Sequence, residues 1–191
     1  FADLFEDSVR IRMRSDVPVG VCLSGGLDST AIICAAARQR GETAAGQSES
    51  LQAFCYMAKE FDESKYITDT LTQTRAQLRQ LETSPAELWS DLRQLLWFQD
   101  EPVHTMTAVV GYQLMRLAAS HGIRVVLNGQ GADETIGGYS SYFQDYWVSL
   151  LRQGRVREAW QAVTGYTEGH GGNSRQRLVA AAARCLSWEM Y

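Results

Sequence analysis

Several features that would place this chain in a membrane or on nucleic acid are missing from its sequence. No apolar run approaches the ~18 residues that a membrane span needs. No signal peptide is visible at the N-terminus. The formal net charge is −4 at pH 7, which argues against a general nucleic-acid binder because such proteins carry basic surfaces. We therefore expect neither a membrane nor a nucleic acid as a partner.

Cysteine is scarce, and its spacing fits neither a metal site nor a redox motif. The four cysteines are Cys22, Cys34, Cys55 and Cys185, and they form no C-x-x-C pair. Cys22 and Cys55 lie in apolar, strand-like runs and Cys34 lies in an Ala-rich helical run, which favours buried, reduced thiols over disulfides or metal ligands. Reduced thiols predict a cytoplasmic protein.

The chain is long enough to form one good hydrophobic core. It has 191 residues, of which 45% are hydrophobic and 21% are charged, as is typical of a soluble globular protein. It begins with Phe1 rather than methionine, which suggests a fragment of a longer protein.

Hydrophobic periodicity predicts strands that alternate with helices. The expected strands cover residues 19–23, 51–57, 76–81 and 123–128, and the expected helices cover residues 4–14, 28–40, 63–75, 85–98 and 105–121. Gly41 is expected to end the second helix and Gly122 the fifth, while Ser84-Pro85 is expected to cap the fourth. Residues 41–50 are small and polar, which predicts a surface loop.

This alternation predicts an α/β fold in which helices cover both faces of a doubly wound parallel sheet. We expect three layers with about five strands over residues 1–140. Residues 141–191 are expected to form a mainly helical extension with a Gly-rich break at 169–173.

Two Gly-rich segments fall at predicted strand ends. "SGGLDS" (residues 24–29) follows the first strand, and "NGQGADE" (residues 128–134) follows the last one. In parallel sheets the carboxyl ends of the strands share one edge, where ligands bind. We therefore expect both segments to lie at the same edge of the sheet.

The chemistry of "SGGLDS" suits an anion. Gly25 and Gly26 allow a sharp turn that aims backbone N–H groups at a ligand, and the following helix directs its positive N-terminus at the same point. Ser24 and Ser29 can donate hydroxyl hydrogen bonds, while Asp28 either binds a metal or caps the helix. The segment matches neither G-x-x-x-x-G-K-[ST] nor G-x-G-x-x-G. A plain Gly-Gly turn is the alternative.

The residues 24–29 resemble the pyrophosphate loop of the N-type ATP pyrophosphatases, which have an adenine nucleotide alpha hydrolase-like fold. "DVPVGVCLSGGLDST" (residues 16–30) and "GIRVVLNGQGADETIGGY" (residues 122–139) are similar to two blocks of the synthetase domain of glutamine-dependent asparagine synthetases. The resemblance implies that ATP and Mg²⁺ activate a carboxylate, aspartate in that family, as an acyl-adenylate. AMP and pyrophosphate are released, and ammonia forms the amide.

The resemblance also implies roles for individual residues. The positions that match ATP and pyrophosphate contacts are Leu23, Ser24, Gly25, Gly26, Asp28, Ser29, Tyr56, Asn128 and Gly129. Asp28 and Asp133 match Mg²⁺ ligands, and Asp133 and Glu134 are the candidate catalytic carboxylates. The alternative for Asp133 and Glu134 is that they only compensate the dipole of a helix N-terminus.

The sequence departs from the family pattern near the acyl substrate. Gln130 stands where the family usually has Glu, and residues 99–112 contain no Arg that could pair with a substrate carboxylate. Thr105, Thr107 and Gln130 remain as candidate substrate contacts. A related amidotransferase, or a lactam or peptide synthetase, acting on another carboxylate is therefore an alternative, as is a nucleotide-binding module without catalysis.

Two parts of the family pattern have no match in this chain. No Cys-led glutaminase segment precedes Phe1, so the glutaminase domain of a full-length protein is an expected partner. No lysine follows Lys65, although the family places one near the adenylation site. Because cations stabilise phosphoryl-transfer transition states, we expect this chain alone to turn over little or not at all. Exposed aromatic residues also make a homodimer an expected assembly.

Overall fold

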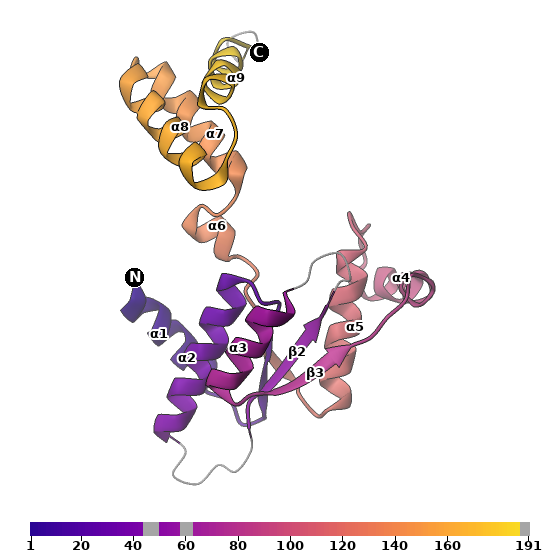
Figure 1. Cartoon of the computed structure of the whole chain (residues 1–191). Coiled ribbons are helices and arrows are strands. Elements are labelled where there is room, and N and C mark those ends of the chain that lie inside the picture. The colour runs from indigo at the N-terminus through magenta and orange to yellow at the C-terminus, as the bar shows by residue number, and fades with distance from the viewer. Residues whose placement is uncertain (44–49, 58–62, 188–191) are drawn as a thin grey trace. The chain divides into compact units, whose positions relative to one another are not determined.

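The computed structural model describes residues 1–43, 50–57 and 63–187, which form the helices and strands drawn in Figure 1. In chain order they are α1 (Ala2–Arg12), β1 (Val19–Cys22), α2 (Leu27–Thr43), β2 (Gln52–Tyr56), α3 (Ser64–Thr74), β3 (Gln77–Leu81), α4 (Pro85–Gln99), α5 (Thr107–Ser120), β4 (Val125–Leu127), α6 (Ala132–Ile136), α7 (Ser140–Arg152), α8 (Val156–His170) and α9 (Ser174–Ser187). The chain packs as two units, Phe1–Gly129 and Gln130–Tyr191. The helical extension was expected to start at residue 141.

The first unit contains a parallel sheet with the strand order β3-β2-β1-β4. Every described strand pair is parallel, and β1 lies in the middle, paired to β2 through Val21 and Ala53 and to β4 through Val21 and Leu127. The predicted α/β fold with a parallel sheet is confirmed. The described residues contain four strands rather than the expected five, because the chain after β4 turns into α6 and not into another strand.

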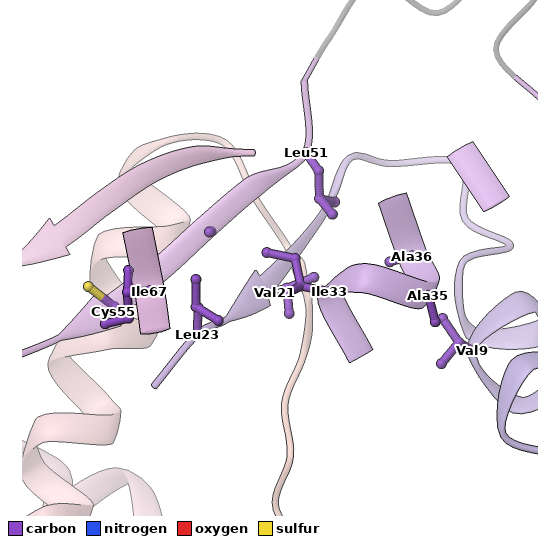
Figure 2. Close-up of a cluster of buried hydrophobic side chains, with 10 residues drawn as sticks. Val9, Val21, Leu23, Ile33, Ala35, Ala36, Leu51, Cys55 and Ile67 are labelled. Atoms are coloured by element: carbon purple, nitrogen blue, oxygen red, sulfur yellow. The ribbon is translucent and has the colours of Figure 1, made fainter. Parts of the chain in front are cut away.

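Helices cover both faces of this sheet, as the alternation of side chains along β2 illustrates. Ala53 and Cys55 belong to the cluster that packs against α1, α2 and α3, which Figure 2 shows around Val21 and Ile33. Phe54 points to the other face and packs against Ala118 of α5 and Ile123. The sheet is therefore the middle of three layers.

Some of the predicted helix ends are confirmed and others are wrong. The predicted cap of α4 is confirmed: the Ser84 side chain accepts from the Glu87 backbone N–H, and the Glu87 carboxylate accepts from the Ser84 N–H. The prediction that Gly41 ends α2 is wrong, since α2 continues to Thr43. Glycine in a helix costs only about 1 kcal/mol relative to alanine, which the packing of α2 on β1 can outweigh. Residues 44–49 of the predicted loop lie outside the described part of the chain.

The second unit is helical, as expected after Gly138. The three longer helices α7, α8 and α9 pack on one another around Trp147, Val148, Val163 and Ala181. The predicted Gly-rich break falls between α8 and α9, where Gly171 and Gly172 have positive φ angles of 74° and 100°. Across the described helices, none is both long and apolar enough to span a bilayer.

Candidate functional site

The segment that follows β1 forms a hydrogen-bonded loop at the N-terminus of α2. The Leu23 N–H donates to the carbonyl of Phe54 at 2.8 Å, which continues the pairing of β1 with β2 to the start of the loop. The carbonyl of Gly26 then accepts from the N–H of Thr30 at 3.1 Å, so the loop ends as the first turn of the helix begins. The first N–H groups of a 17-residue helix are thereby directed at the loop without helical partners of their own.

The two serine hydroxyls stabilise the loop itself. The Ser29 hydroxyl donates to the Gly26 carbonyl at 3.2 Å and accepts from the Ser24 N–H at 3.2 Å. It also lies 3.1 Å from the Ser24 hydroxyl, which accepts from the Gly26 N–H at 3.3 Å. Ser29 is buried and Ser24 is exposed. In this arrangement Ser29 supports the turn from inside, while Ser24 remains accessible from solvent.

Position 25 requires glycine for two reasons, its backbone conformation and the closeness of neighbouring atoms. Its φ angle is 87°, a conformation that L side chains rarely adopt. A Cβ atom at this position would lie 2.9 Å from the Cβ of Glu63 and 3.2 Å from its carbonyl oxygen, at the start of α3. The loop is therefore held closely against the α3 terminus, and no larger residue fits there.

The segment that follows β4 reaches the same loop. A Cβ on Gly129 would lie 3.0 Å from the Asp28 Cβ and 3.2 Å from the Ser29 backbone nitrogen, so the Gly129 backbone packs on the first turn of α2. The pairing of β1 with β4 brings this about, because both strands are parallel and end at one edge. The predicted meeting of the two Gly-rich segments at this edge is confirmed for the part of "NGQGADE" that ends at Gly129.

Two further predicted nucleotide contacts lie on the strands beside the loop. Leu23 is 1% exposed, so it can offer a ligand only its backbone. Tyr56 ends β2, and the β1–β2 register, continued by two residues, brings it level with Ser24. Asn128 is exposed directly after β4.

Asp133 lies in the second unit and is shaped by the glycines that follow it. Its carbonyl accepts from the N–H groups of both Gly137 and Gly138 at 3.0 Å. A Cβ on Gly138 would overlap the Asp133 Oδ1 and lie 2.8 Å from its Cγ. The glycine pair therefore folds the chain back over the carboxylate of Asp133 at the end of the five-residue helix α6.

Glu134, the second candidate catalytic carboxylate, has a hydrogen-bond partner. Its Oε1 accepts from the hydroxyl of Tyr139 at 2.9 Å, and Tyr139 packs edge-on against Tyr142 with ring centroids 5.5 Å apart. This hydrogen bond raises the pKa of Tyr139, because the neighbouring carboxylate accepts the phenol proton and repels a phenolate. Sequence reasoning missed this partner, although "GGY" follows the acidic pair by only a few residues.

The candidate substrate contacts are exposed. Thr107 is the first residue of α5, and the Thr105 carbonyl accepts from the Ala108 N–H at 3.3 Å. Because α5 leads to the start of β4, it begins near the edge where the parallel strands end. Gln130 is exposed at the start of the second unit.

Side chains that can ligate a metal do not cluster in the described structure. In residues 1–43, 50–57 and 63–187, no three His, Cys, Asp or Glu side chains gather as a metal site would require. Asp28 offers one carboxylate beside the loop. All four cysteines are free thiols, and burial raises the pKa of Cys22 and Cys55 to about 11, which keeps them protonated at neutral pH.

Comparison with known proteins identifies the family. The sequence model of the asparagine synthase family matches residues 1–189. Asparagine synthetase [glutamine-hydrolyzing] 1 of Bacillus subtilis is 34% identical over 142 residues, which cover 73% of this chain and 21% of that protein. The asparagine synthetase [glutamine-hydrolyzing] of Zea mays is 30% identical over 141 residues, or 72% of this chain and 24% of the relative.

A relative with a different name matches almost the whole chain. Amidase chyE of Penicillium rubens is 26% identical over 194 aligned residues, which cover 97% of this chain and 27% of that protein. The chain thus spans only about a fifth to about a quarter of the curated relatives described here. Since the family model covers nearly every residue, the chain belongs to the asparagine synthase family.

Proposed function

We propose that this chain is the nucleotide-binding part of an ATP-dependent ligase that activates a carboxylate and converts it to an amide. The observation that carries this proposal is the loop at residues 24–29, closed by its own serine hydroxyls and packed under Gly129 at the N-terminus of α2. Such a preformed loop offers oriented N–H groups to phosphate. Membership of the asparagine synthase family supports ATP as the anion.

In this proposal the loop binds the pyrophosphate portion of ATP. Backbone N–H groups around Gly25, Gly26 and Ser29 and the hydroxyl of Ser24 donate to phosphate oxygens, and the α2 terminus supplies partial positive charge. Leu23 and Tyr56 hold the adenosine by backbone contacts. Asn128 and Gly129 complete the nucleotide contacts from the end of β4.

Mg²⁺ is the proposed cation, and it would neutralise phosphate charge and hold ATP for attack. In nucleotide sites Mg²⁺ needs only one or two carboxylates, because phosphates and waters complete its shell. Asp28 fits this requirement beside the loop, and Asp133 is the proposed second ligand. Asp133 and Glu134 are the proposed catalytic carboxylates, with Tyr139 positioning Glu134 through its hydroxyl.

Aspartate is the proposed carboxylate, with asparagine, AMP and pyrophosphate as products after ammonia attacks the acyl-adenylate. Thr105, Thr107 and Gln130 would contact the acyl substrate. Ammonia would come from the glutaminase domain of a full-length protein in the cytoplasm. A different carboxylate is the second candidate, supported by Gln130, by the lack of Arg in residues 99–112 and by the match to Amidase chyE.

The test is calorimetric titration of the chain with ATP and Mg²⁺. We expect Asp28→Ala to abolish Mg²⁺-dependent binding while circular dichroism shows an unchanged fold, since the Cβ that touches Gly129 is kept. Asp69→Ala, an exposed carboxylate on α3, is the matched control and should bind like wild type. Equal ATP affinity in all three proteins would refute the role of Asp28.

Binding of a non-hydrolysable aspartyl-adenylate mimic distinguishes aspartate from a different carboxylate as the substrate. If aspartate is the substrate, the mimic should bind more tightly than ATP, because it adds the acyl contacts to the nucleotide contacts. Binding of ATP without any binding of the mimic would favour the second candidate.

A further inference from the structure

A cleft lined by both polar and apolar side chains lies in the first unit, and its residues are distant in sequence from the loop at residues 24–29. It opens where β3 ends, between α4 and α5, and has a volume of about 470 Å³. Figure 1 shows these three elements. The residues that line it and carry the argument are Glu82, Thr83, Glu87, Asp91, Gln113 and Arg116. None of them belongs to the proposed nucleotide site, and a volume of this size suits a small ligand.

Gln113 has an unmet hydrogen-bond acceptor beside this cleft. It is 8% exposed, and its Nε2 donates to the Asp91 Oδ2 at 2.8 Å. A carboxylate only accepts, so this contact fixes which end of the amide faces Asp91. The Gln113 Oε1 is then buried, with no hydrogen-bond partner in the described part of the chain.

Thr83, from the segment after β3, adds a second unmet group. Its hydroxyl oxygen is also buried without a partner among the described residues. Buried polar atoms are nearly always paired, so two of them on one cleft are unusual. Both residues line the cleft, so a ligand that brings N–H donors into it would pair both atoms once the two side chains turn toward it.

The charged residues that line the cleft favour a positively charged ligand. Arg116 places its Nη1 at 3.2 Å from both carboxylate oxygens of Asp91, so these two charges offset each other. Glu82 and Glu87 leave the lining negative. Glu87 is already engaged at the α4 cap, whereas no ion pair or hydrogen bond of Glu82 is found within the described residues. An anion would meet two carboxylates and a guanidinium that is already paired.

We propose that this cleft binds a small primary amine in its ammonium form. The ammonium has three N–H donors and no acceptor, which matches an amide oxygen, a hydroxyl and a carboxylate. Gln113 turns about its bond to Asp91 so that Oε1 faces the ligand, Thr83 accepts a second N–H, and Glu82 supplies the opposite charge. Leu81 and Leu117 also line the cleft and receive a short alkyl chain. This inference does not depend on the proposed nucleotide chemistry.

The test uses three probes of equal length, butylammonium, butyrate and 1-butanol, titrated into the ¹⁵N-labelled full chain. We expect saturable shifts of the Gln113 side-chain amide and the Thr83 amide with butylammonium. The other two probes should bind at least about tenfold more weakly, because neither brings a charged donor. Shifts that do not saturate, shifts confined to other residues, or stronger binding of butyrate would overturn the proposal.

The butylammonium affinity of variants shows whether these polar side chains bind the ligand or only line the cleft. Gln113→Met keeps the size of the side chain but removes the acceptor, and we expect about fivefold weaker butylammonium binding. Thr83→Val provides the same test if the first variant does not fold. Glu82→Gln should also weaken binding, whereas Asp69→Asn removes the same charge from exposed α3 and should not. Wild-type affinity in the folded Gln113 or Thr83 variant would refute the proposal.

Discussion

The two Gly-rich segments that follow β1 and β4 are built differently. The loop at residues 24–29 contains a buried serine, is crossed by side-chain hydrogen bonds and is packed against Glu63 and Gly129. The segment after Gly129 forms a five-residue helix without a buried residue, and its local contacts are those of Asp133 with Gly138 and of Glu134 with Tyr139. The first segment is part of a core, and the second is a local turn.

This difference indicates what each segment can contribute. A loop fixed by the core presents its N–H groups in one arrangement, which is what recognition of a phosphate requires. A short exposed helix held by a few polar contacts can change at small energetic cost. Substitutions in the two segments should therefore differ in how far their effects spread.

The largest effect is expected from Gly25→Ala. This substitution should lower the free energy of unfolding by about 2–4 kcal/mol. The reason is that Gly25 has a positive φ angle and that the added Cβ would lie 2.9 Å from the Glu63 Cβ. Urea denaturation followed by circular dichroism measures the change. Gly111→Ala is the control: it lies inside α5 with open space in the described structure and should raise stability by about 1 kcal/mol. Equal effects of both variants would mean that the loop is not held as described.

Gly138→Ala should disturb only its own segment. The new methyl group overlaps the Asp133 carboxylate, which must turn away, and the three atoms nearest to it all belong to Asp133 at this exposed position. We expect amide shifts at residues 133–139 and a loss of stability of about 1 kcal/mol or less. Gly169→Ala, in α8 with open space around it, should leave the Asp133 resonance in place. Global destabilisation as large as that of Gly25→Ala would contradict the contrast between the segments.

The smallest effect is expected at the Tyr139–Glu134 hydrogen bond. The raised pKa of Tyr139 means that the neutral phenol is favoured in the folded state, so this contribution to stability is present below the unfolded pKa of tyrosine and is lost as pH rises through the folded pKa. Glu134→Ala should bring the pKa of Tyr139 back toward its ordinary value. Absorbance titration at alkaline pH measures it, with Tyr139→Phe identifying the signal. An unchanged titration would show that the hydrogen bond does not form in solution.

Much of the fold could be predicted from local patterns. The apolar runs gave the positions of β1, β2 and β4, and Ser84-Pro85 marked the start of α4, because these features are decided by neighbouring residues. The end of α2 could not be read from Gly41, since one glycine weighs less than the packing of the whole helix.

The part of the candidate site that could be predicted is the part where parallel strands bring two sequence motifs to one edge of the sheet. Parallel pairing of β1 and β4 was enough to expect Gly129 near the loop. The closeness of Glu63 to Gly25 was not predictable, because it depends on how α3 packs. Gln113 carried one signal: it follows buried Val109 by one helical turn, at a position where an apolar residue is normal.

The most direct test of the central claim is a ¹H–¹⁵N spectrum of the chain recorded during titration with ATP and Mg²⁺. We predict that the largest amide shifts occur at Gly25, Gly26, Asp28 and Ser29, that they saturate, and that they vanish in Asp28→Ala. Saturable shifts confined to residues outside this loop, or no shifts at millimolar ATP, would contradict the assignment of residues 24–29 as the ATP-binding loop.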